Sequence, residues 1–170
     1  MKIPSVLFTG AMLFCGASSM RATAALGAPD EAFIKVAAQH SMTEIRLGEI
    51  AKAKAAQPGV KEFGEMLATD YAKAKEELRK LASANEIPIP DKLEDQYQAT
   101  VDRFEELSET EFDKSFIDQM VGDHEKNVAA FEAASRTAEN PALKEFVEKT
   151  LPTLREHLKR GQALQKGIPK

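Results

Sequence analysis

The sequence predicts an all-α protein in which two similar helical hairpins form a four-helix bundle. Apolar residues recur at helical spacing through four long segments after residue 30, and prolines stand where segments meet. A shift of 83 residues also aligns residues 58–63 (Pro-Gly-Val-Lys-Glu-Phe) with residues 141–146 (Pro-Ala-Leu-Lys-Glu-Phe). A repeat of this length that begins at a proline each time indicates a duplicated hairpin.

The first 24 residues are predicted to be a signal peptide. Lys2 supplies the positive start, the apolar stretch 6–14 is too short to span a bilayer, and residues 22–24 (Ala-Thr-Ala) fit signal peptidase. We expect cleavage after Ala24, with Ala28 as an alternative later site. The mature domain, residues 25–170, would then reside in the periplasm or the outer envelope.

The composition excludes several classes of protein. Cys15 follows Phe14, where a lipoprotein motif requires a small residue, so no lipid anchor is expected. Loss of the leader removes the only cysteine, which suits an oxidising compartment. Because the chain has 27 acidic residues against 23 basic ones, and basic residues do not cluster, we expect no nucleic-acid partner. No later segment has the ~18 apolar residues of a transmembrane helix.

The first hairpin is predicted from Asp30 to residue 87. Asp30 is a good N-cap, and the apolar positions that follow it continue at helical spacing to Ala51. Pro58 suits the first turn of the second helix, and the Ile-Pro-Ile-Pro run at 87–90 ends that helix.

A crossover and a second hairpin follow. Residues 91–107 have the spacing of a short helix, and Ser108 offers an N-cap for the next long one. That helix is expected to stop near Asn140, where Pro141 begins the last helix. Two hairpins joined by a long helical crossover form a ferritin-like four-helix bundle.

Polar residues interrupt the apolar stripes near the middle of the predicted bundle. Glu44 lies 14 residues before Pro58 and Asp70 lies 12 after it, so they are at similar heights on antiparallel helices. Counting from Pro141 in the same way places His124 and His157 side by side. The same stripes carry further polar residues, namely His40, Tyr71 and Asp123.

Three interpretations of these residues remain open. Glu44, Asp70, His124 and His157 could bind a divalent metal such as zinc, iron or manganese. Alternatively, the set forms a buried polar network with His40, Tyr71 and Asp123 that fixes helix pairing, or it reaches solvent at the stripe edges. A di-iron oxidase site is not expected, because both Glu-x-x-His motifs are missing.

Four stretches resemble a known family. They are 44–51 (Glu-Ile-Arg-Leu-Gly-Glu-Ile-Ala), 58–63, 112–124 with its Met-Val-Gly-Asp-His ending, and 151–158 (Leu-Pro-Thr-Leu-Arg-Glu-His-Leu). Together they resemble the secreted family known as domain of unknown function 4142, whose members are often described as outer-membrane proteins and grouped with ferritin-like folds. The family usually has an Asp-His pair in the second helix, whereas this chain has Asp70-Tyr71. His40 could return an imidazole from the first helix. The resemblance implies the fold and an exported location but no reaction.

The sequence therefore favours a non-enzymatic, exported helical-bundle protein with a structural polar cluster. Nucleophile elbows, phosphate loops and dinucleotide fingerprints are missing, and the mature chain has no cysteine. The alternative is a metal-binding bundle. A further possibility is an interaction module that binds an envelope protein through the connector at 88–107, or that forms a homo-oligomer.

Overall fold

Helices make up most of the protein. The computed structural model describes residues 26–168, and the predicted signal peptide at 1–24 lies outside them. Within the described range there is no strand, and the five helices are α1 (Ala28–Lys54), α2 (Pro58–Ala84), α3 (Asp95–Glu106), α4 (Glu109–Thr137) and α5 (Pro141–Gly167). The all-α prediction is confirmed.

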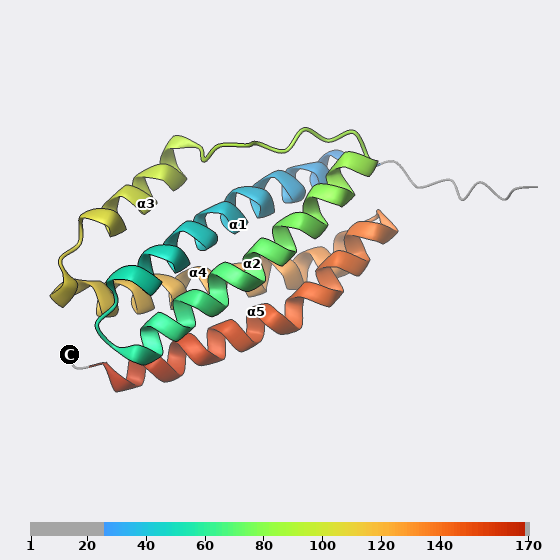
Figure 1. The fold of residues 1–170 in the computed structure, drawn as a ribbon. Helices are drawn as coiled ribbons and strands as arrows, with labels where there is room; N and C mark the ends of the chain where they lie inside the picture. The colour runs from blue at the N-terminus through green and yellow to red at the C-terminus, as the bar shows by residue number, and fades with distance from the viewer. Residues whose placement is uncertain (1–25, 169–170) are drawn as a thin grey trace, which may run out of the picture.

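The long helices pair as the internal repeat predicts. Figure 1 shows α1 and α2 as one antiparallel hairpin and α4 and α5 as the other, with α3 lying outside them over α1. Helix α1 also packs against α4, and α2 packs against α5, so the two hairpins bury their apolar faces against each other. The chain crosses from α2 to α4 through an extended segment and α3.

Most predicted helix ends agree with the structure. Pro58 and Pro141 are the first residues of α2 and α5, and the Asn140 side chain caps α5 by accepting bonds from the amides of Ala142 and Leu143. The crossover helix begins at Asp95, later than the predicted 91. Gln39 explains this difference, because its side-chain amide bonds the carbonyl of Lys92 and the amide of Glu94. These bonds hold the segment between α2 and α3, residues 85–94, in an extended conformation, and we call this segment the strap.

The prediction that Asp30 caps α1 is wrong. The N-cap is Gly27, and the buried Asp30 carboxylate instead accepts bonds from the amides of Glu139 and Asn140, at 3.2 and 3.0 Å, in the turn between α4 and α5. The equivalent residue in the repeat behaves in the same way: Asp113 of α4 accepts bonds from the amides of residues 56 and 57, at 3.0 and 2.8 Å, in the turn between α1 and α2. Each hairpin thus closes the turn of the other. We call these two residues the reciprocal aspartates.

The first hairpin is packed more closely than side chains normally permit. A Cβ atom added at Gly48 would lie 2.5 Å from the carbonyl oxygen of Gly64, and one added at Gly64 would lie 2.6 Å from the Cβ of Ala51. The backbones of α1 and α2 can approach this closely only because both residues are glycine. The repeat places Phe131 and Val147 at the equivalent positions of the second hairpin, so the two hairpins differ at this level.

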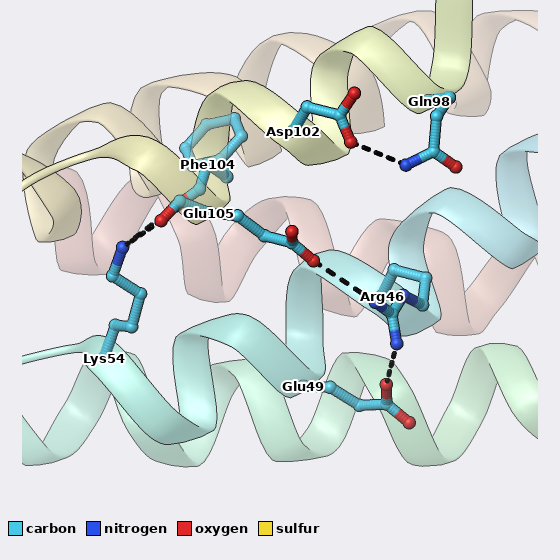
Figure 2. Close-up of polar contacts among 7 residues, drawn as sticks. All are labelled: Arg46, Glu49, Lys54, Gln98, Asp102, Phe104 and Glu105. Carbon is cyan, nitrogen blue, oxygen red and sulfur yellow. Dashed lines mark hydrogen bonds and ion pairs between the residues drawn. The ribbon is translucent and has the colours of Figure 1, made fainter. Parts of the chain in front are cut away.

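Helix α3 is held to α1 by charged contacts and by one deeply buried aromatic ring. Figure 2 shows Arg46 against the Glu105 carboxylate, at 3.2 Å, and the Lys54 ammonium donating to the backbone carbonyl of Phe104. Lys54 also donates to the backbone carbonyl of Glu105, at 2.6 Å. A cation at this position satisfies carbonyls that the helix leaves unpaired. Phe104 is fully buried and packs edge-on against Phe112 and Phe116 of α4.

Candidate functional site

Three aromatic side chains meet at the middle of the bundle, one from each of three helices. The ring centroids of Tyr71 in α2 and His124 in α4 are 5.8 Å apart, those of Tyr71 and His157 in α5 are 5.8 Å apart, and those of the two histidines are 5.4 Å apart. All three residues are buried. The expected proximity of His124 and His157 is confirmed. We call Tyr71, His124 and His157 the central ring cluster.

His124 is saturated with hydrogen bonds from the protein. Its Nδ1 lies 2.8 Å from the carbonyl oxygen of Met120, one turn earlier, and must carry the proton to donate to it. Its Nε2 is therefore an acceptor, and the Tyr71 hydroxyl donates to it at 3.1 Å. Burial, with the nearby His157, lowers the pKa of His124 to about 4. The imidazole is consequently neutral at physiological pH.

His157 retains one unpartnered nitrogen. Its Nε2 lies 3.2 Å from a carboxylate oxygen of Asp70, while its buried Nδ1 has no partner among the described residues. Burial lowers the pKa of His157, although Asp70 opposes that effect. Asp70 lies nearer the surface and also accepts a bond from Lys73 at 3.0 Å. Burial favours a higher pKa for Asp70, but the bonds from Lys73 and His157 hold its pKa below the usual value.

Glu44 is buried apart from that pair. It is 1% exposed, and its Oε2 atom has no hydrogen-bond partner within residues 26–168. Burial raises the pKa of Glu44 well above its usual range, and the negative charge of Asp123 raises it further. Burial therefore favours the protonated, uncharged form of Glu44. It shares no hydrogen bond with Asp70, although the two were predicted at similar heights.

His40 and Asp123 lie beside the central ring cluster. The His40 ring packs edge-on against Tyr97 of α3, with centroids 5.4 Å apart, and burial lowers the pKa of His40. Asp123 accepts a bond from Gln119 at 2.6 Å and lies 3.7 Å from the Lys126 ammonium. Both contacts of Asp123 are within its own helix.

Asn127 is a buried polar residue that the sequence analysis missed. Its side-chain amide approaches the Tyr71 hydroxyl oxygen at 3.5 Å, and only 7% of the residue is exposed. It stands three residues after His124, on the same face of α4, so helical spacing could have identified it. Its amide carries no charge, so Asn127 does not belong to the ionisable residues that mark the site in the sequence.

The fit of a metal to these residues can be judged from their donor atoms. Among residues 26–168, no three His, Cys, Asp or Glu side chains converge as metal ligands would. Both nitrogens of His124 are already hydrogen bonded, Asp70 bonds His157, and the buried Glu44 shares no hydrogen bond with any of them. The arrangement supplies a hydrogen-bonded network in this conformation and not a tetrahedral ligand set.

Comparisons with known proteins agree with the fold. A solved structure described as a DUF305 fragment from Deinococcus radiodurans has a TM-score of 0.74 and 12% identity, over 85% of this chain and 99% of that one. Another, described as CopM in the Cu(I)-bound form, has a TM-score of 0.67 and 19% identity, over 81% of this chain and 96% of that one. At such identities the likeness concerns the fold alone. No helix within residues 26–168 has the length and apolar character needed to cross a membrane.

The family assignment rests on sequence. No curated protein matches the chain. The model of a family described as a domain of unknown function (DUF4142) matches residues 15–164, which include every helix except the last few residues of α5. The chain belongs to the DUF4142 family.

Proposed function

We propose that this is a non-enzymatic bundle of the cell envelope, whose central ring cluster is structural and fixes how the two hairpins pair. The observation that carries the proposal is the saturation of His124, which takes its two hydrogen bonds from Met120 and Tyr71 while 0% exposed. A general base or a metal ligand needs a free lone pair that a substrate or ion can reach. His124 has none, and a satisfied buried network specifies which helices meet.

Metal analysis and thermal unfolding test this proposal together. Protein purified without chelator should contain substoichiometric metal, and added Zn²⁺, Mn²⁺ or Fe²⁺ should leave its Tm unchanged. The double variant His124→Ala/His157→Ala should unfold at lower temperature with or without these ions. His40→Ala is the matched control, because it removes the remaining histidine without touching the central ring cluster. Stoichiometric metal that is lost only in the double variant would refute the structural role.

A second candidate, metal binding, is supported by two buried atoms. His157 Nδ1 and Glu44 Oε2 both lack partners within the described chain, and unpartnered buried polar atoms are uncommon. The similar structure described as CopM in a Cu(I)-bound form adds copper to the ions worth testing. Under this candidate, Glu44, Asp70, His124 and His157 would have to rearrange around the ion. Anaerobic titration with Cu(I), measured in the wild type and in Glu44→Gln, would reveal saturable binding that the variant weakens.

The envelope location is also part of the proposal. It rests on the sequence of residues 1–24, with a mature domain at 25–170 and no lipid on Cys15. Expression of the full chain in a bacterium, followed by fractionation and N-terminal sequencing, tests it. Mature protein in the periplasmic or outer-membrane fraction that begins at Ala25 is the expected result. Full-length protein retained in the cytoplasm would contradict export.

A further inference from the structure

The bundle contains a cavity of about 160 Å³ beside the central ring cluster. It lies among α1, α2, α4 and α5, in the half of the bundle that holds the start of α1. Its wall is largely aromatic and aliphatic, and is formed mainly by Phe33, Ala37, Ala74, Phe131, Phe146 and Leu154. Apolar cavities of about 150 Å³ are large enough to admit benzene. The space thus matches a single aromatic ring in both size and lining.

Small residues create this space. Ala37 of α1, which is buried, and Ala74 of α2, which is partly exposed, line the wall, and the three phenylalanines around them do not fill the volume that these methyl groups leave. Phe33 and Phe131 contact each other, with centroids 5.0 Å apart, and Phe131 also packs on Phe146 at 6.2 Å. Aromatic rings prefer to meet at such distances, so a bound ring would join a cluster that already exists.

The wall offers little to hold water. The hydroxyls of Ser41 and Thr150 both donate to carbonyls of their own helices, at 2.8 and 2.7 Å. The Tyr71 hydroxyl donates its proton to His124. Asn127 and His40 are the exceptions. The Asn127 amide has one long contact of 3.5 Å to Tyr71 and no other hydrogen bond with a described residue, and the His40 ring, which packs edge-on against Tyr97, has no hydrogen bond with one. A buried water needs two to four polar partners, whereas one hydroxyl group of an organic molecule needs only one or two.

The charges at the rim disfavour an ionised ligand. Val36 is 50% exposed and, with Lys126 and Ala130, marks the side on which the cavity opens. Lys126 is the one charged side chain in the described wall, and Asp123 lies 3.7 Å from its ammonium. No uncompensated charge therefore remains to offset the cost of desolvating an anion or a cation.

We propose that this cavity binds a small neutral aromatic molecule that carries one hydroxyl group, of the size of phenol. The ring occupies the space between Phe33, Phe131 and Phe146, and the hydroxyl bonds the Asn127 amide. This site goes beyond the structural role proposed for the central ring cluster and does not depend on it, because the ligand uses Asn127 and leaves the bond between Tyr71 and His124 intact.

Titration of the full mature chain with phenol, followed by amide shifts in NMR spectra, tests the site. Phenol should cause saturable shifts confined to residues around the cavity, toluene should bind at the same place, and benzoate should not bind. Asn127→Leu keeps the side-chain volume but removes the amide and with it one hydrogen bond. It should therefore weaken the binding of phenol about fivefold and leave the binding of toluene unchanged. Ala37→Leu should fill the cavity and abolish the binding of both phenol and toluene. Ala133→Leu, an exposed position on α4 outside the wall, is the matched control.

Several results would overturn the proposal. They are the lack of saturable phenol binding, shifts scattered over the surface, binding of benzoate as tight as that of phenol, and an Asn127→Leu variant that weakens phenol and toluene equally. Unchanged phenol binding in a folded Ala37→Leu variant would do the same. If Ala37→Leu fails to fold, the location of the shifts in the wild type still decides the question, because it requires no variant.

Discussion

The reciprocal aspartates predict that the same substitution has different costs at two equivalent positions. Asp113 uses both carboxylate oxygens, since Oδ1 accepts from the amide of Ala56 and Oδ2 from that of Gln57. Asp30 uses Oδ2 alone for both of its bonds. An asparagine at 113 would turn its NH₂ group toward one of the two amides, which are themselves donors. An asparagine at 30 can keep both bonds through its single oxygen.

The magnitude follows from the bonds affected. A hydrogen bond to a charged group contributes about 1.5–3 kcal/mol, and a neutral one about 1 kcal/mol. Asp113→Asn exchanges one such bond for a contact between two donors, so it should lower the free energy of unfolding by about 3 kcal/mol. Asp30→Asn weakens two bonds without losing either, and should cost about 1 kcal/mol. Alanine at either position removes both bonds, and should cost about 3 kcal/mol.

Urea unfolding followed by far-UV circular dichroism measures these differences, because the chain has no tryptophan to serve as a fluorescent probe. The gap of about 2 kcal/mol between the two asparagine variants corresponds to roughly 4–8 °C in Tm. Equal losses for Asp30→Asn and Asp113→Asn would refute the reasoning, since they would mean that the geometry of the individual oxygens does not matter. Alanine variants as stable as the wild type would mean that these hydrogen bonds contribute nothing to the free energy of unfolding.

Three more predictions concern the core. In the same urea assay, Gly48→Ala should destabilise the protein by about 1–3 kcal/mol, because its Cβ would clash with the Gly64 carbonyl. Gly122→Ala should instead stabilise it by about 0.5–1 kcal/mol, because its Cβ would meet nothing within 4 Å. The pKa of Glu44 is higher in the folded state than in the unfolded chain, which releases its proton around a pKa of 4.5. Glu44→Gln should therefore gain stability over wild type as the pH rises above 4.5. A difference in the free energy of unfolding that stays constant from pH 4.5 to about pH 8 would contradict this. The shift of His124 has the opposite sign, because its pKa falls from 6.5 to about 4 on folding and the unfolded chain therefore takes up the proton first. The free energy of unfolding of the wild type should fall by about 3 kcal/mol as the pH drops from 6.5 to about 4. In His124→Gln that part of the acid slope should vanish, and an identical slope in calorimetry would argue against a buried neutral imidazole.

The parts of the fold that could be predicted are those set by neighbouring residues. Pro58 and Pro141 begin helices because a proline suits a first turn, and this depends on little beyond the local chain. Asp30 was assigned wrongly for the complementary reason. Its preference for helix starts is local, but its partners stand about 110 residues away, and sequence propensity carries no information about them.

The candidate site divides in a similar way. Counting residues from each hairpin turn gives the height of a side chain along the bundle, and this was enough to predict that His124 and His157 lie side by side. Height does not determine the direction in which a side chain leaves its helix. Glu44 and Asp70 were matched in height, yet Asp70 bonds His157 while Glu44 remains without a partner at Oε2. Small differences in helix rotation decide such pairings, and they depend on the packing of the whole core.

The reciprocal aspartates also bear on the ancestry of the bundle. A lone hairpin with one such aspartate and one such turn has an acceptor and two donors that it cannot bring together itself. In two copies related by a twofold axis, the aspartate of each copy meets the turn of the other, because an isologous contact places the same residues of both copies in the interface. The present chain retains that exchange between its halves. It is the pattern expected of a homodimer whose two subunits were joined by gene duplication, with the strap and α3 as the joining segment.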